Sequence, residues 1–236
     1  MKSILNMINL YISSSLLILF MLLLYNIDKE MNKSVIPLSK DLTSQIVEAR
    51  AEEITSWIEE RTNEIKLIGN QIYYSNMSLD EGLKYMNFLL KDDNTYESLG
   101  LIDEDGMAWI SDGSKFSIVD REYYKRIKEE KSIFIISNPL RSQSNETDIV
   151  IMIYRLPVNS GSKFQYISAA VPIETIKDIA AAIQLYDGGS KIYDVLGHPI
   201  GDNNDVENER DIIEFSAPVK GSPEWTIVFK VPEYRL

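Results

Sequence analysis

The hydrophobic pattern begins with an apolar run near the amino terminus. No charged residue occurs in residues 3–27, and residues 16–25 read LLILFMLLLY. At about 1.5 Å per helical residue, this stretch is long enough to cross the roughly 30 Å hydrocarbon core of a membrane. The residues that follow, YNIDK at 25–29, contain no small-x-small cleavage site and so argue against a removable signal peptide. The pattern predicts a single membrane-anchoring helix over residues 1–28.

After the apolar run, hydrophobic residues recur every three to four positions. Pro37 suits the first turn of a helix, and Leu38, Ile46, Trp57 and Ile68 belong to an apolar stripe with acidic residues between its members. The spacing predicts a long amphipathic helix of about 30 residues that leaves the membrane. Its apolar stripe either packs only into the core of the following domain or also forms a parallel homodimer contact. The sequence leaves both alternatives open.

Shorter elements follow the long helix. Ser78 and Glu81 form a Ser-x-x-Glu capping box, which predicts a second helix to about Lys91. From residue 96 the period changes to two, which predicts strands over residues 99–103 and 107–111 around a tight turn. The segment DREYYKRIKEE predicts a short helix, and a further strand is expected over residues 133–137.

A repeated pattern divides this region into two copies. LIDEDGMAWI, from Leu101, is echoed by IYDVLGHPIG, from Ile192, and both contain Asp-x-x-Gly. The aspartate can accept hydrogen bonds from turn amides, while glycine tolerates positive φ. Each copy also closes with a hairpin that carries prolines at matching positions, 157 and 172 in the first and 218 and 232 in the second. The repeat predicts two modules, residues 29–186 including the long helix and residues 187–236.

The two copies differ in what lies between their hairpins. Only the first carries the short helix and the extra strand, whereas the second has a short acidic link over residues 202–211. Because a pocket needs an element that covers the sheet, the first copy is predicted to hold it. A helix over residues 173–185 connects the copies, and the sequence DGG at 187–189 ends it.

Charge and composition exclude several function classes. Twenty-four basic and 36 acidic residues give a formal charge of −12, which does not provide the basic surface that nucleic acids require. The chain has no cysteine, so disulfides and cysteine metal sites are excluded. The single histidine, His198, is interpreted as a surface turn residue. No phosphate-binding loop, metal cluster or catalytic pair stands out, so neither an enzyme nor a cofactor is predicted.

Over residues 35–236 the chain resembles the double Cache sensor domains found outside the membrane in bacterial chemoreceptors, histidine kinases and diguanylate cyclases. The resemblance rests on the order of the long first helix, the Asp-x-x-Gly hairpin and the segments DREYYKRI, ISNPL, IETIKDI and EWTIVFKVPE. It implies an α+β fold in which two tandem PAS-like antiparallel-sheet modules follow one transmembrane helix and a long stalk helix. It further implies a cell-membrane protein with most of its chain extracytoplasmic and a small-molecule ligand in the membrane-distal module. Members of the family normally continue into a second transmembrane helix and a cytoplasmic transmitter; residues 1–236 contain no transmitter segment, so such an output domain is either truncated away or never existed.

The resemblance also names candidate ligand-binding residues. In amino-acid-binding members of the family, an aromatic residue and an Arg-x-aromatic-aromatic segment bind the ligand carboxylate, which Phe116, Arg121, Tyr123 and Tyr124 match. An arginine fork can meet a carboxylate bidentately, and tyrosine hydroxyls add donors. Alternatively, the two tyrosines pack the short helix against the sheet and Arg121 pairs with an acidic neighbour.

The part of the family pattern that binds the ligand amine is missing. Pro172 stands where the aspartate would be, and Leu140 and Ser142 replace an expected tyrosine and aspartate. The expected ligand is therefore a small carboxylate or similar polar or anionic metabolite, not an α-amino acid, because a buried ammonium without a charged partner costs several kcal/mol. Three classes of function remain: a ligand-binding sensor, a ligand-free dimerisation or spacer module, and an enzyme.

Overall fold

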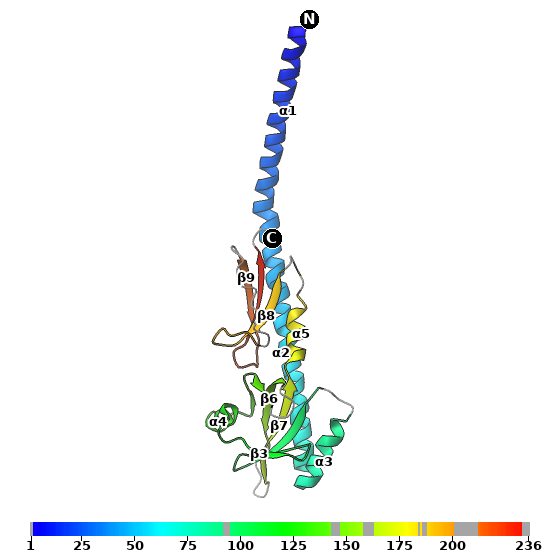
Figure 1. Cartoon of the computed structure of the whole chain (residues 1–236), viewed down its shortest axis with the longest axis vertical. Coiled ribbons are helices and arrows are strands. Elements are labelled where there is room, and N and C mark those ends of the chain that lie inside the picture. Colours follow the sequence, from blue (N-terminus) through cyan, green and yellow to red (C-terminus); the bar gives the residue numbers. More distant parts are fainter. Residues whose placement is uncertain are drawn as a thin grey trace.

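A long helical rod runs along most of the molecule, and two β-sheets lie beside its carboxyl-terminal part (Figure 1). The computed structural model describes residues 2–91, 95–142, 147–157, 163–183, 185, 188–200 and 212–232. The rod consists of α1 (Lys2–Glu30), a π-helical turn η1 (Met31–Val35) and α2 (Ile36–Tyr74). The amino terminus lies at the end of the rod that carries no sheet (Figure 1).

The rod is continuous where a new helix was predicted to begin. Pro37 lies in the first turn of α2, as predicted, but α2 follows directly on η1 and has 39 residues. A proline lacks an amide hydrogen, and its ring clashes with the carbonyl four residues before it in an α-helix. Next to Pro37, the Ile36 amide donates to the Met31 carbonyl five residues back. The wider turn gives the ring space, so α1, η1 and α2 form one continuous rod.

Two antiparallel sheets pack along α2. The seven-stranded sheet has the order β3-β2-β1-β7-β6-β4, with β5 paired to β6. Its strands are β1 (Ser98–Asp103), β2 (Met107–Ile110), β3 (Lys115–Ser117), β4 (Phe134–Ile136), β5 (Leu140–Arg141), β6 (Asp148–Arg155) and β7 (Phe164–Pro172). The three-stranded sheet has the order β8-β10-β9 and consists of β8 (Gly189–Tyr193), β9 (Ile212–Pro218) and β10 (Thr226–Pro232).

Three short helices complete the fold: α3 (Leu79–Leu89), α4 (Glu122–Glu129) and α5 (Glu174–Ala181). The predicted capping box is confirmed, since the Ser78 side chain accepts from the Glu81 amide and Glu81 Oε2 accepts from the Ser78 amide at 2.8 Å. The helix and strand predicted only for the first copy correspond to α4 and β4.

The helix that connects the two copies, α5, is shorter than predicted. The acidic link at 202–211, the hairpin turn at 158–162 and residue 187 lie outside the described residues.

The repeated Asp-x-x-Gly turn has the same structure in both copies. Gly106 and Gly197 have φ angles of +79° and +80°. The Asp103 and Asp194 carboxylates each accept two amide hydrogens across the turn, from Asp105 (3.0 Å) and Met107 (2.9 Å) in the first copy and from Leu196 (2.9 Å) and His198 (2.8 Å) in the second. In the second copy, a single bridge between Tyr193 and Pro199 replaces the strand that follows the turn.

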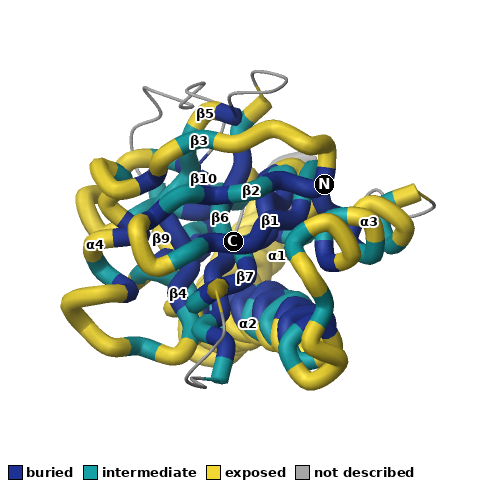
Figure 2. Tube along the Cα trace, turned by 90° about the horizontal axis from the view of Figure 1, so that it is seen from below, coloured by how far each residue is buried: buried dark blue, intermediate teal, exposed yellow. Residues whose placement is uncertain are grey.

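The apolar stripe of α2 is buried against both sheets, as Figure 2 shows for the side of α2 that faces the strands. One continuous core joins this stripe to the inner faces of both sheets; its buried members from α2 are Val47, Ala51, Ile54, Ile58, Ile65, Ile68 and Ile72. A second, smaller core lies on the other face of the seven-stranded sheet, next to α4, and includes Ile102, Ile118, Tyr124, Ile127 and Tyr166. The sheet therefore has two buried faces.

Replacing Gly106 with alanine should destabilise the protein more than replacing Gly197. Positive φ costs an alanine roughly 1–2 kcal/mol at either position. A Cβ at residue 106 would also lie 2.7 Å from Val119 Cγ2 and 2.9 Å from Tyr124 Cε1, whereas nothing lies within 4 Å at residue 197. Thermal unfolding of the two full-length variants measures the difference. Equal losses would contradict the packing account of the first turn.

Candidate functional site

A cavity lies on the face of the seven-stranded sheet that turns away from α2. Its volume is about 70 Å³, well below the roughly 300–1,000 Å³ of pockets that hold drug-sized ligands. Apolar side chains from β1, β2 and β6, the segment after β3, and β7 form most of its wall, namely Ile102, Ala108, Ile110, Ile118, Ile149, Ile151 and Ala170. The cavity therefore suits a ligand of few heavy atoms with an apolar part.

Arg121 brings a positive charge to this cavity. It is the N-cap of α4, with extended backbone angles (φ −72°, ψ 133°), and its side chain is half-buried and lines the cavity. Its guanidinium has no hydrogen-bond or ion-pair partner within the described part of the chain. A guanidinium stays charged in proteins and carries five donor hydrogens. Among the described residues, the site thus presents a cation without a counter-ion.

Phe116 and Tyr123 line the same cavity. Phe116 is on β3, and Tyr123, which is 8% exposed, is on the first turn of α4. Burial raises the pKa of the Tyr123 hydroxyl, and the nearby charge of Arg121 opposes this shift without cancelling it. The hydroxyl therefore stays protonated at neutral pH and remains a hydrogen-bond donor.

Tyr124, the fourth predicted residue, points elsewhere. One residue advances a helix by about 100°, so neighbouring side chains leave it in different directions. Tyr124 is 2% exposed, its hydroxyl donates to the Glu104 carbonyl at 3.3 Å, and its ring meets the edge of Tyr166 at 6.1 Å between centroids. It packs α4 onto the sheet. The structure thus brings three of the four predicted side chains together and places Tyr124 outside the cavity lining.

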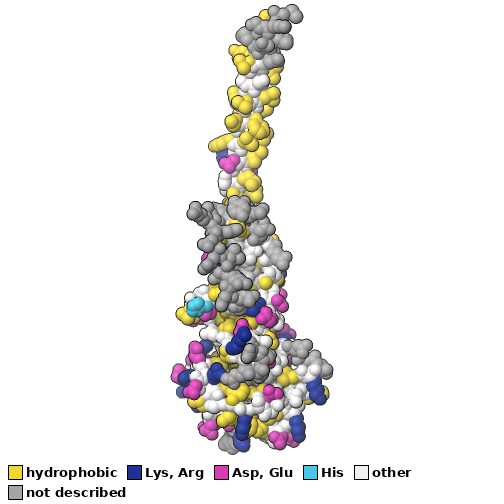
Figure 3. Space-filling view, viewed as in Figure 1, with side chains coloured by type: hydrophobic (Ala, Val, Ile, Leu, Met, Phe, Trp, Pro, Cys, Tyr) yellow, Lys and Arg dark blue, Asp and Glu magenta, His cyan; other side chains and the backbone are white. Residues whose placement is uncertain are grey.

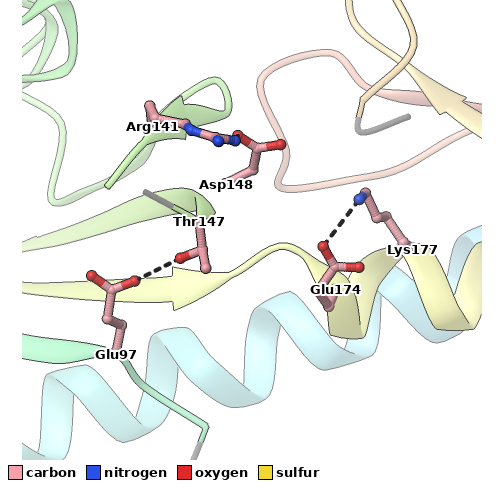
Figure 4. Close-up of polar contacts among 6 residues, drawn as sticks. All are labelled: Glu97, Arg141, Thr147, Asp148, Glu174 and Lys177. Atoms are coloured by element: carbon pink, nitrogen blue, oxygen red, sulfur yellow. Dashed lines mark hydrogen bonds and ion pairs between the residues drawn. The ribbon is translucent and has the colours of Figure 1, made fainter. Parts of the chain in front are cut away.

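Glu97 is a cavity residue that the sequence reasoning missed. It precedes β1, its amide donates to the Ala170 carbonyl at 2.8 Å, and it lines the cavity. Its carboxylate accepts hydrogen bonds from the Ser142 hydroxyl and from Thr147 Oγ1, the latter at 3.1 Å (Figure 4). In the sequence, nothing distinguishes Glu97 from a solvated charge.

The acidic group of the cavity therefore comes from the segment before β1 and not from the end of β7, which the family pattern indicated. Ser98 pairs with Ala170 across the β1–β7 ladder, so Glu97 lies beside the end of β7, where Pro172 stands. Leu140 and Ser142 also line the cavity, and Pro172 is not among its lining residues. The sequence did not predict a carboxylate in this cavity, and the expectation that the ligand is not an ordinary α-amino acid stays a prediction.

A second arginine, Arg141 on β5, lines the cavity but is already paired. Its Nη1 lies 3.1 Å from Asp148 Oδ1 (Figure 4). Glu174 and Lys177 on α5 form a separate pair at 3.0 Å. Arg121 is therefore the cation of the cavity that has no partner among the described residues.

Two of the larger hollows have charged lining residues that differ from those of this cavity. A groove of about 320 Å³ lies between α2, α3 and β1, but its carboxylate, Glu64, is bound by Arg61 at 2.8 Å and by the Tyr96 hydroxyl at 2.7 Å. A cleft of about 310 Å³ separates the two sheets and is lined by residues 138–141 and Asp148 on one side and by Asp194, His198, Pro199 and Ile200 on the other.

His198 lies at the surface of the molecule, as predicted for a turn residue. Its side chain is 72% exposed, and its Nδ1 lies 3.4 Å from Asp194 Oδ2. Figure 3 shows it on the outside of the molecule, and it lines the rim of the cleft between the two sheets. Nothing in this geometry prepares the imidazole for catalysis.

The fold matches solved ligand-binding domains of bacterial receptors. The ligand-binding domain of the Pseudomonas fluorescens chemoreceptor CtaA in complex with L-isoleucine aligns with a TM-score of 0.68 and 16% identity over 87% of this chain and 97% of that one. The domain of the Pseudomonas aeruginosa chemoreceptor PctC with GABA aligns with a TM-score of 0.64 and 14% identity, covering 82% and 98%.

The extracellular domain of the putative histidine kinase rpHK1S-Z16 aligns equally well, with a TM-score of 0.68 and 13% identity over 84% of this chain and 97% of that one. No family model and no curated protein matches the sequence. The fold implied by the double Cache resemblance is confirmed: α+β, with a long first helix and two antiparallel sheets.

The two neighbouring tyrosines should respond differently to loss of their hydroxyl groups. Tyr123→Phe removes a donor from the cavity and should weaken carboxylate binding about three- to tenfold, with little effect on stability. Tyr124→Phe removes the bond to Glu104 and should cost about 0.5–1.5 kcal/mol of stability while leaving binding unchanged. Calorimetric titration and thermal unfolding separate the two effects. The opposite pattern would show that Tyr124, not Tyr123, faces the ligand.

Proposed function

We propose that the chain is the extracytoplasmic sensor region of a membrane-anchored signal-transduction protein, and that it binds a small carboxylate metabolite in the cavity of the seven-stranded sheet. The observation that carries the proposal is the guanidinium of Arg121, which lies at a mostly apolar cavity without a partner among the described residues. Removing a charge from water is costly unless it is paired. A ligand carboxylate would supply the missing partner through a bidentate contact.

The other residues of the cavity support a ligand of this kind. Tyr123 adds a neutral donor beside Arg121, and Phe116 with the isoleucine-rich wall accommodates an apolar portion. The solved domains with the same fold were crystallised with L-isoleucine and with GABA, both of which carry a carboxylate. Because the cavity also contains Glu97, a ligand amine fits the proposal as well.

The apolar surface of α1 supports the membrane anchor. The helix contains an 18-residue window with a mean hydropathy of 2.0, and none of this window is buried in the protein. Exposed apolar side chains of this number are unfavourable in water and suit the interior of a bilayer. A single pass here places both sheets on the same side of the membrane.

The start of α2, together with η1, supports a parallel homodimer just outside the membrane. Val35, Leu38, Leu42 and Ile46 recur at three- to four-residue spacing, and all four are exposed. Their spacing matches the seam by which two helices pack against each other. A dimer contact would be compatible with ligand binding, since the cavity lies on the sheet face that turns away from α2.

Membranes that contain the protein test the role of the N-terminal helix. Extracted protein should retain its first residues by N-terminal sequencing, and a sequence that starts after about residue 28 would contradict the anchor. Because the chain has no cysteine, Leu42→Cys should give a disulfide-linked dimer on mild oxidation, whereas Asp41→Cys on the neighbouring face should not. Equal cross-linking of both would contradict the proposed seam.

Ligand-induced stabilisation tests the sensor function. Full-length protein in detergent is screened by thermal shift against small carboxylates and amino acids, and each hit is titrated by calorimetry. A ligand at a hundredfold its Kd should stabilise the protein by about 2.7 kcal/mol. Arg121→Ala should abolish binding, and Lys125→Ala, an exposed charge on α4, should not. Affinity that survives Arg121→Ala would contradict the proposal, and a complete lack of hits would favour a ligand-free spacer.

A further inference from the structure

We infer that Glu97 sets the charge selectivity of the cavity, so that it accepts a ligand with one carboxylate and rejects a ligand with two. The inference rests on the proposed function, in which Arg121 binds the ligand carboxylate. It adds a specificity residue and narrows the class of ligand. Monocarboxylates with or without an amine are admitted, and dicarboxylates are excluded.

The charges that line the cavity determine this preference. Glu97, Arg121 and Arg141 are its charged lining residues among those described. Arg141 is paired with Asp148 at 3.1 Å, which leaves Arg121 to bind an anion. Among the described lining residues, a second ligand carboxylate would therefore find only Arg141, for which it would compete with Asp148, and it would share a small space with Glu97. Like charges brought together in a partly desolvated site repel strongly.

The carboxylate of Glu97 is also held in place. Oε1 accepts from the Ser142 hydroxyl and Oε2 accepts from Thr147 Oγ1, so each oxygen has its own donor. These donors lie 45 and 50 residues away in the sequence, one after β5 and one before β6. Moving the carboxylate out of the cavity would break both hydrogen bonds. The negative charge is thus a fixed part of the wall.

The remaining polar groups do not offset this charge. Ser98, Ser114 and Ser168 line the cavity, but hydroxyl groups are neutral. Ser168 Oγ already donates to the Gly100 carbonyl at 3.5 Å. The rest of the wall is mostly apolar. A neutral amide in place of the second carboxylate avoids the repulsion while it keeps nearly the same shape.

The experiment compares matched ligands that differ in one charge. Full-length protein is titrated with three series: propionate, malonamate and malonate; butyrate, succinamate and succinate; and alanine, asparagine and aspartate. In a series that binds, the dicarboxylate should bind at least about tenfold more weakly than its amide analogue. Glu97→Gln should bring the two within about threefold, mainly because the dicarboxylate binds more tightly to this variant than to the wild type.

Two further variants test whether the charge of Glu97 is responsible. Glu97→Asp keeps the negative charge and should keep the weaker binding of dicarboxylates relative to their amides. This variant is measured as well in case Glu97→Gln does not fold. Glu129→Gln removes an exposed charge on α4 and should leave the discrimination unchanged. If Glu129→Gln reduces the discrimination as much as Glu97→Gln does, net charge is the cause and the inference is overturned.

Arg121→Ala separates the failure of this inference from the failure of the proposed function. Loss of all binding in Arg121→Ala, together with equal affinity of the wild type for dicarboxylates and their amides, overturns the role of Glu97 and leaves the proposed function intact. If Glu97→Gln still binds dicarboxylates much more weakly than their amides, the role of Glu97 is likewise overturned and the proposed function is left intact. Binding that survives Arg121→Ala, or no binding in any of the three series, overturns both.

Discussion

The burial of the apolar stripe of α2 is the interaction on which the rest of the structure depends. Ile54 and Ile58 at one level of the helix and Ile65 and Ile68 at another are all buried in a single core that reaches both sheets. The three-stranded sheet alone is too small to exclude water from large side chains such as Trp225, which is fully buried here. Both sheets therefore depend on one helix for the burial of their inner faces, and this fixes where each lies along the rod.

Because side chains alternate along the strands, one face of the seven-stranded sheet packs against α2 and the other face lines the cavity. On β1, Leu99 and Leu101 join the core with α2, whereas Ile102 belongs to the opposite face and lines the cavity. Successive residues of a strand point to opposite faces, so one strand contributes to both regions. The face that does not hold the helix is available for polar residues such as Arg121. A cavity on the inner face would instead weaken the core that joins the two sheets.

Local patterns in the sequence predicted the local structure well. The Ser78–Glu81 capping box and the two Asp-x-x-Gly turns were predictable because each depends on a few neighbouring residues. The segment DREYYKRIKEE predicted the short helix α4, and the family resemblance indicated Arg121 as a ligand-binding residue. The direction of Tyr124 was not predictable, because it depends on how α4 is rotated against the sheet. Glu97 was missed because its partners lie 45 and 50 residues away and only the folded sheet brings them together.

The short strand β5 separates two spaces. Leu140 and Arg141 line the cavity on one side and, on the other, the cleft of about 310 Å³ that faces Asp194 and His198 of the second module. Packed protein has little free volume with which to absorb a displaced strand. A change in the position of β5 at the cavity is therefore also a change in the wall of the cleft, so this two-residue strand gives a steric link between the cavity and the residues of the second copy.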